Sequence, residues 1–255
     1  MPPLLRVSGL TFSYDPEAEP LLRGVTFECN TGKIYGLFGN NGSGKTTLFN
    51  IICGLTRHTA GQIDYYGGVP SSLSPSNICS FRHGLARTFQ VPALVDEISV
   101  FDNLTLARRS VGERFCDVLH SASRLDEKFE SQIEEYLRAV AIDPLANKAA
   151  GSLSYGERRL VSDLMALLTG AQIVLMDEPF SNVDAGRLDA LKRLLRKEAR
   201  EAGKCIVIIE HSPEHLAQDL IDSVFCLRKT LVVNGFEGSP QETLRVINSF
   251  TYDEA

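Results

Sequence analysis

Residues 39–46, "GNNGSGKT", place three glycines, a lysine and a threonine between an apolar run and a predicted helix. This order fits the G-x-x-x-x-G-K-[S/T] pattern, which requires a strand before it and a helix after it. The glycines allow successive backbone N–H groups to curve around an anion, and the helix N-terminus adds its dipole. We therefore expect a phosphate-binding loop, and a glycine-rich turn before an ordinary helix is the less favoured alternative.

The loop residues have separate predicted roles toward a nucleotide. Lys45 is expected to reach the β- and γ-phosphates as a point charge, and the Thr46 hydroxyl to complete the shell of a magnesium ion. Gly39 and Thr47 flank these residues and belong to the same predicted site. The amides expected to face the α- and β-phosphates are those of Asn40, Asn41, Gly42, Ser43 and Gly44.

A second motif could supply the carboxylates that a phosphate site needs. "IVLMDE" places Asp177 at the C-terminal end of an apolar run, and Glu178 follows directly. Ligands bind at the carboxyl ends of parallel strands, so Asp177 can hold magnesium through water. Glu178 can polarise the attacking water as a general base. An acidic pair after a strand can also be a solvated turn or a helix cap, but the phosphate loop favours catalysis.

A third motif resembles a known family. "LSYGE" at residues 153–157, followed by "RRLVSDLMALL", resembles the signature of ATP-binding cassette ATPases, and the resemblance covers essentially the whole chain. Further matches are Tyr14 in "FSY", at the position of the aromatic residue that stacks on adenine, Gln90 in "RTFQ", the loop "SNVD" at 181–184, and His211 in "IIEH". Taken singly, Tyr14 could be a strand-end aromatic, Gln90 a surface amide and His211 a loop histidine.

The resemblance implies an α/β fold: a P-loop NTPase (RecA-like) core with a parallel sheet, an N-terminal antiparallel β subdomain and a helical insert. It also implies ATP and Mg²⁺ as cofactors, and a head-to-tail dimer with a second, identical or homologous, nucleotide-binding subunit. In such a dimer each ATP lies between one subunit's phosphate loop and the other's signature. The residues that would serve the ATP bound opposite are Ser154, Tyr155, Gly156, Glu157 and Asp184.

The same resemblance completes the expected chemistry. His211 would contact the γ-phosphate and join Lys45 and Glu178 as the catalytic residues. Gln90 would link the metal site, formed with Thr46 and Asp177, to the helical insert. The family docks transmembrane permease subunits on that insert, so closure of the ATPase dimer would move the transporter.

Sequence patterns predict the elements that position these motifs. Residues 4–14 and 25–39 read as strands, with a predicted hairpin turn at 30–32, so antiparallel β-structure should open the chain. A helix from 45 to 55 and a strand at 61–68 should follow. The apolar runs 171–179 and 204–212, separated by a helix that Asp184 could cap and Gly203 could end, predict a parallel sheet buried on both faces.

The region between residues 99 and 160 reads as helical. One predicted helix carries an apolar stripe at helical spacing, formed by Phe129, Ile133, Tyr136, Leu137 and Val140. We therefore expect residues 1–255 to form a single nucleotide-binding domain. Its helical subdomain would span about 91–160, and residues 1–90 and 161–255 would form the ATPase core with the antiparallel β subdomain.

Composition narrows the class of protein. With 44% hydrophobic residues and a net charge of −6, the chain can bury a sizeable core and has no basic block that would follow nucleic acid. The six cysteines lack the spacing of zinc or redox sites and are expected to be buried thiols. Because no apolar run approaches the length of a membrane span, we expect a cytoplasmic protein, peripheral on the cytoplasmic face of the inner or plasma membrane.

The transported solute is the least constrained expectation. "GLARTFQ", the tyrosine of "LSYGE" and "IIEH" look most like ATPases of importers for branched-chain and other hydrophobic amino acids or amides. Two departures are the "SNVD" loop and the segment "LVSDLMALL", in which Asp163 is unusual. A soluble cassette ATPase for cofactor assembly or repair would keep the same catalytic residues. A phosphate-loop kinase or GTPase fits less well, because it leaves the signature unexplained.

Overall fold

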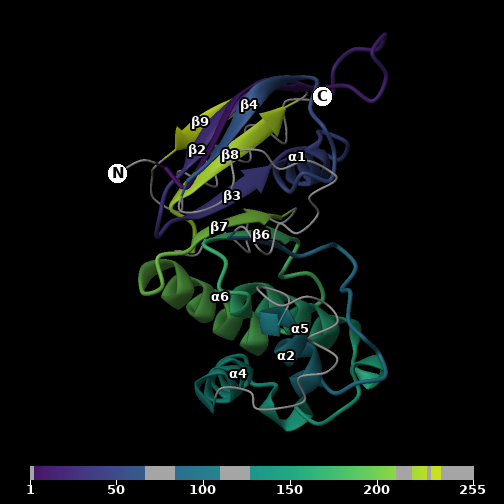
Figure 1. Cartoon of the computed structure of the whole chain (residues 1–255), viewed down its shortest axis with the longest axis vertical. Coiled ribbons are helices and arrows are strands. Elements are labelled where there is room, and N and C mark those ends of the chain that lie inside the picture. The colour runs from purple at the N-terminus through teal and green to yellow at the C-terminus, as the bar shows by residue number, and fades with distance from the viewer. Residues whose placement is uncertain (1–2, 67–83, 110–126, 211–219, 229–230, 237–255) are drawn as a thin grey trace.

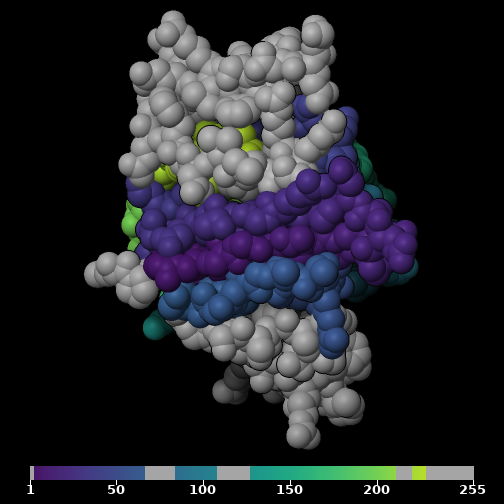
Figure 2. Space-filling model, turned by 90° about the horizontal axis from the view of Figure 1, so that it is seen from above, coloured from purple at the N-terminus to yellow at the C-terminus, as the bar shows by residue number. Residues whose placement is uncertain are grey.

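The computed structural model describes residues 3–66, 84–109, 127–210, 220–228 and 231–236. The strands and α1 lie toward one end of the molecule, and α2, α4 and α5 lie at the other (Figure 1). A three-stranded antiparallel sheet has β1 in the middle, and Figure 2 shows its three strands as adjacent bands. These strands are β1 (Leu5–Phe12), β2 (Leu22–Cys29) and β4 (Ala60–Tyr65). The predicted antiparallel opening of the chain is therefore confirmed.

The second sheet carries the motifs. Its strands pair in parallel except for the last, which is antiparallel to its neighbour. The predicted parallel sheet is confirmed. In spatial order the strands are β5 (Leu85–Arg87), β6 (Ile173–Asp177), β7 (Cys205–Ile209), β3 (Ile34–Phe38), β8 (Ser223–Arg228) and β9 (Leu231–Phe236).

Alternating side chains of this sheet enter two different cores. Every residue of β3, β6 and β7 is buried. In β6, Val174 and Met176 join the cluster formed with the helices, whereas Ile173 and Leu175 join the cluster formed with α1 and the antiparallel sheet. Successive residues of a strand point to opposite faces, so an uninterrupted apolar run is what a sheet covered on both faces requires.

The helices confirm the predicted periodicity. All five residues of the apolar stripe that begins at Phe129 are buried. Asp184 caps α6, because its side chain accepts a hydrogen bond from the Arg187 N–H at 3.1 Å. The helices are α1 (Lys45–Ile52), α2 (Val100–Arg109), α4 (Glu127–Ala139), α5 (Tyr155–Leu168) and α6 (Ala185–Arg200), with short 3-10 helices η3 (Asp143–Leu145) and η4 (Ala150–Ser152).

The predicted hairpin at residues 30–32 is wrong. The chain turns there, but β2 pairs with β1, whereas β3 pairs with β7 and β8 in the other sheet. The physical reason is burial. Buried and exposed residues alternate along most of β2, as suits a sheet with one covered face, while β3 is buried throughout and needs apolar strands on both sides. Turn residues show where a chain reverses, but they do not select the partner strand.

Four of the six cysteines lie in the described part of the chain, and all four are buried and free, as predicted: Cys29, Cys53, Cys205 and Cys226. Cys79 and Cys116 lie outside it. Among the helices that the structure describes, none has the length and apolar character needed to cross a membrane.

Candidate active site

The parallel sheet brings the phosphate loop and the acidic pair together. The loop follows β3, and Asp177 ends β6, so both lie at the carboxyl edge of the sheet. A cleft of about 510 Å³ opens at this edge. Most of the predicted nucleotide site lines it: Tyr14, residues 41–47, Gln90, Asp177 and Glu178.

The conformation of the loop suits an anion. Gly44 precedes α1 with φ of 97°, which is in the left-handed region, and a Cβ there would lie 2.9 Å from Leu22 Cδ2. The hydroxyl of Ser43 is buried and has no hydrogen-bond partner among the described residues. The first turn of α1 carries no acidic residue. The Ser43 hydroxyl is thus free to donate to a phosphate group, and no carboxylate in the first turn of α1 would repel that group.

Lys45 points back across the loop. Its ammonium donates hydrogen bonds to the carbonyls of Gly39 at 2.6 Å and Asn40 at 3.2 Å. Burial lowers the pKa of Lys45, while the charges of Asp177 and Glu178 oppose that change. Within the described residues Lys45 forms no ion pair of 4 Å or less, so its charge can be neutralised by a phosphate.

Asp177 forms a buried ion pair. Its carboxylate lies 3.6 Å from the Arg87 guanidinium, and both side chains are almost fully buried. Burial raises the pKa of Asp177, and the positive charge of Arg87 counteracts that rise. Arg87 also donates to Asn50 of α1 at 2.6 Å. Sequence reasoning missed Arg87, although a basic residue directly before "TFQ" was a visible signal.

Glu178 has an unusual backbone. Its φ of 55° lies in the left-handed region, which a non-glycine residue seldom adopts and which often marks a functional position. Its carboxylate accepts hydrogen bonds from the Gln90 amide and from the Ser181 hydroxyl, each at 3.3 Å. The side chain is thereby oriented beside a polar amide at the cleft.

Tyr14 lies at the mouth of the cleft and is 74% exposed. Its hydroxyl is 3.0 Å from the Thr47 hydroxyl, and its ring packs edge-on against Phe12. An aromatic ring that is anchored at both ends and exposed beside a phosphate loop can stack on a nucleobase. Stacking on adenine remains a prediction.

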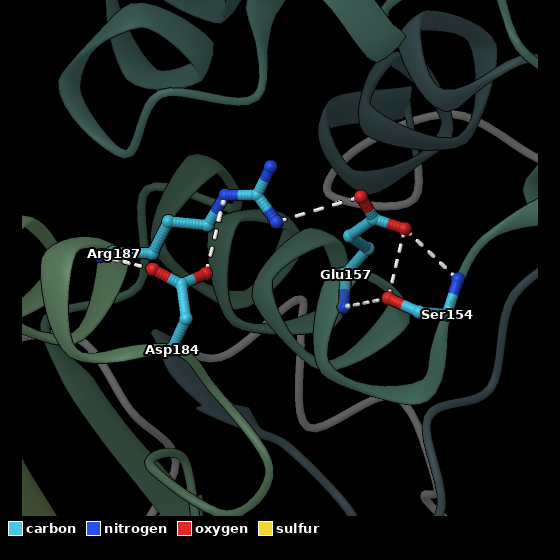
Figure 3. A network of polar contacts seen from close by, with 4 residues as sticks. All are labelled: Ser154, Glu157, Asp184 and Arg187. Carbon is cyan, nitrogen blue, oxygen red and sulfur yellow. Dashed lines mark hydrogen bonds and ion pairs between the residues drawn. The ribbon is translucent and has the colours of Figure 1, made fainter.

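The signature residues form a second polar group, which Figure 3 shows. Ser154 caps α5, and the Glu157 carboxylate accepts from the Ser154 N–H at 2.9 Å and hydroxyl at 2.8 Å. Arg187 reaches both Glu157 and Asp184, at 3.4 and 3.5 Å. Burial acts to raise the pKa of Glu157, but the hydrogen bonds from Ser154 and the charge of Arg187 outweigh it, so the pKa lies below its ordinary value.

Gly156, the second residue of α5, lies where the helix approaches another backbone segment closely. A Cβ at Gly156 would lie 2.1 Å from the carbonyl oxygen of Asn182, in the loop between β6 and α6. The described residues lining the cleft do not include Ser154, Gly156, Glu157 or Asp184. Their role toward a nucleotide bound to another subunit stays a prediction.

Tyr155 and His211 differ from the other predicted site residues. Tyr155 belongs to the signature, but its hydroxyl donates to the Gln90 carbonyl at 2.7 Å, which links the signature to the cleft. His211 lies outside the described residues. Sequence reasoning also missed Arg159, a fully buried arginine of α5 whose guanidinium donates to the carbonyls of Phe89 and Gln90.

The fold and the cleft together define a phosphate-loop nucleotide-binding protein whose cleft is lined by the acidic pair Asp177 and Glu178. The family model described as "ABC transporter" matches residues 22–181. Because this match spans more than half of the chain, the chain belongs to the ABC transporter family, as an ATPase that binds and hydrolyses ATP. Mg²⁺ is the general cofactor of such ATPases, and the oxygen donors Thr46 and Asp177, which both line the cleft, fit it.

Two similar proteins and one solved structure agree with this assignment. The chain is 29% identical over 245 residues to the high-affinity branched-chain amino acid transport ATP-binding protein BraF of Pseudomonas aeruginosa, covering 94% of this chain and 93% of BraF. It is 31% identical over 244 residues to the phosphonates import ATP-binding protein PhnC of Wolinella succinogenes, covering 94% and 84%. A crystal structure of an ATP-binding cassette of an ABC transporter in its ADP conformation superimposes with a TM-score of 0.76 at 26% identity, covering 97% and 96%.

Proposed function

We propose that the protein is the ATP-hydrolysing subunit of an importer and works as a head-to-tail pair with an identical or homologous subunit, driving a membrane-spanning permease. One observation carries the proposal. The phosphate cleft and the capped N-terminus of α5 are separate surfaces of one chain. The dipole at this helix N-terminus, which Glu157 partly offsets, favours an anion, and a second subunit's ATP would supply it.

In this proposal Lys45 neutralises the β- and γ-phosphates, and Tyr14 stacks on adenine. Thr46, Asp177 and Gln90 hold the metal, directly or through water. Glu178 takes the proton of the attacking water, and His211 contacts the γ-phosphate. The hydrogen bond from the Gln90 amide to the Glu178 carboxylate supports placing the metal and the base side by side.

An apolar hollow supports the membrane partner. About 250 Å³ in volume, it lies where the segment after β5 meets α2 and α5, and its lining includes Phe89, Ala93, Leu106 and Met165. A short helix of a permease with apolar side chains suits such a hollow. The protein would then sit on the cytoplasmic face of the membrane, with Gln90 beside the docked permease.

For the solute we propose branched-chain or other hydrophobic amino acids or amides. The match to BraF over nearly the whole of both chains supports this choice, as do "GLARTFQ", the signature tyrosine and "IIEH". The chain matches a phosphonate import protein to a similar degree, so the solute class needs a direct test. Purification of the chain with its native permease and solute-binding partners, followed by uptake of labelled leucine and of a labelled phosphonate, would test the solute class.

The shared site is tested by mixing two inactive proteins, Lys45→Ala and Ser154→Ala. In a mixed dimer one composite site carries both lesions and the other carries neither, so up to about half of the wild-type rate per dimer should return if the sites are independent. Lys45→Ala mixed with itself is the control. No recovery despite proven mixed dimers would refute shared sites, and a chain that never self-associates would require a non-identical partner.

The membrane role has its own test. The proposal predicts that the chain sediments with membranes containing its permease and that the permease stimulates ATP hydrolysis. Persistent failure to copurify with any membrane protein would instead favour a soluble ATPase in cofactor assembly or repair.

A further inference from the structure

The segment that carries Gln90 has few attachments of its own. This segment, residues 89–94, lies between β5 and α2, and both Phe89 and Gln90 are exposed. Among the described residues, the only main-chain hydrogen bonds from 89 to 94 are those accepted by the carbonyls of Phe89 and Gln90. All the donors are side chains of α5. The position of Gln90 therefore depends on that helix.

Arg159 provides most of this attachment. Its side chain is completely buried, and its two terminal nitrogens donate to the Phe89 carbonyl at 2.6 Å and to the Gln90 carbonyl at 2.8 Å. Tyr155, one turn earlier on the same face, donates to the same Gln90 carbonyl at 2.7 Å. The planar guanidinium holds two consecutive carbonyls at once, which a lysine ammonium cannot do with the same geometry.

The hydrogen bonds from Arg159 and Tyr155 to the carbonyls of residues 89 and 90, called the clasp below, act on the reaction through one further contact. The side-chain amide of Gln90 donates to the Glu178 carboxylate at 3.3 Å. We propose that Arg159 is a positioning residue for ATP hydrolysis: it holds the main chain at Gln90 against α5, so that the Gln90 amide stays beside Glu178. Small displacements of catalytic groups lower the rate of the chemical step more than they weaken substrate binding.

The clasp also joins two surfaces. Its donors come from the first two turns of α5, whose N-terminus carries Ser154 and Gly156. If that N-terminus binds the ATP of a second subunit, a movement there is transmitted through Tyr155 and Arg159 to Gln90 in the chain's own cleft. This consequence rests on the proposed function, whereas the effect of Arg159 on Gln90 and Glu178 is internal to one chain.

The test uses the absence of tryptophan from the sequence. Val91 follows Gln90 and is 73% exposed, so Val91→Trp introduces a single fluorescent reporter on the segment. All further variants are compared in that background. Arg159→Met should lower the nucleotide-free fluorescence anisotropy by roughly a third and kcat by roughly tenfold or more, with KM and the ATP dissociation constant changing less than about threefold. Arg159→Lys should be intermediate.

Arg158→Met is the matched control. Arg158 is the adjacent arginine of α5 and also donates to a carbonyl, that of Ala150, but its ion pair is with Asp96. Within the described part of the chain it forms no hydrogen bond or ion pair with residues 89–90. It should leave kcat and anisotropy within about twofold of the background. Arg159→Met behaving like this control would overturn the proposal. So would a fall in kcat that matches only the unfolded fraction while anisotropy stays unchanged.

These readouts separate the two proposals. Anisotropy is measured without nucleotide and needs no partner subunit. If the mixing experiment fails to restore activity, the shared sites are refuted, but the anisotropy and kcat of Arg159→Met still decide whether the clasp exists.

Discussion

Substitution of Gly156 by alanine probes the contact between the signature helix and the loop that follows Glu178. An added Cβ would lie 2.1 Å from the Asn182 carbonyl oxygen and 3.1 Å from its carbon, whereas ordinary contacts are 3.4–4 Å. Both groups belong to the backbone, so no side-chain rotation relieves the clash. The helix and the loop must separate by roughly 1 Å, and overpacking of this kind costs about 1–3 kcal/mol.

The chain offers a matched control in Gly186. Gly156 and Gly186 are both the second residue of a helix, but a Cβ at Gly186 meets only Asp184 Oδ1, at 3.5 Å. Gly186→Ala should therefore gain up to about 1 kcal/mol from helix propensity. Both variants share the propensity gain, so the difference between them isolates the clash, and we expect it to be about 1–3 kcal/mol.

Urea unfolding followed by circular dichroism at 222 nm measures this difference, and ATP hydrolysis measured on the same preparations reports its effect on the site. Gly156→Ala should unfold at lower urea and lose about tenfold or more of its hydrolysis rate, because the loop after Glu178 is displaced. Equal unfolding midpoints and equal rates in the two variants would refute the close approach between α5 and this loop.

Three further predictions address single side chains. Glu178→Gln should keep ATP binding but hydrolyse roughly a hundredfold or more slowly, with an ATP-bound dimer accumulating on size exclusion; normal turnover would remove Glu178 as the base. Tyr14→Ala should weaken ATP binding by roughly 1 kcal/mol in calorimetry. Tyr14→Phe loses only the hydrogen bond to Thr47, so it should weaken ATP binding less. Equal losses in the two variants would argue against stacking. Asp163 is fully buried and neither carboxyl oxygen has a partner among the described residues; burial raises its pKa well above the ordinary 3.8, with the charge of Arg159 opposing. The contribution of Asp163 to stability is thus complete below about pH 4 and is lost as pH rises through the folded-state pKa. In urea unfolding, the free energy of unfolding of Asp163→Asn should therefore exceed that of the wild type by an amount that grows above pH 4, by up to about 1.4 kcal/mol per pH unit. A difference that does not depend on pH would contradict this.

Sequence patterns predicted the local parts of the structure well. The phosphate loop, the acidic pair and the capped helix α6 are set by residues close together in the chain, since glycine conformation, capping and periodicity act over a few residues. The buried runs at β6 and β7 similarly showed a parallel sheet covered on both faces. Most of the residues that line the cleft were therefore identifiable before the structure; Leu21 and Ile209 were not.

Contacts between distant segments were decided only by the tertiary structure. The turn at 30–32 was visible, but the sheet that β3 joins depends on burial on both its faces. Arg87 beside Asp177 and Arg159 on the Gln90 carbonyl join residues 90 and about 70 positions apart. The sequence does not indicate whether a given arginine side chain will face water or a buried carbonyl, because its partner depends on the packing of elements that are distant in the chain. The sequence by itself thus determined which groups could perform the chemistry, and the packing of α5 against the segment after β5 determined what holds them in place.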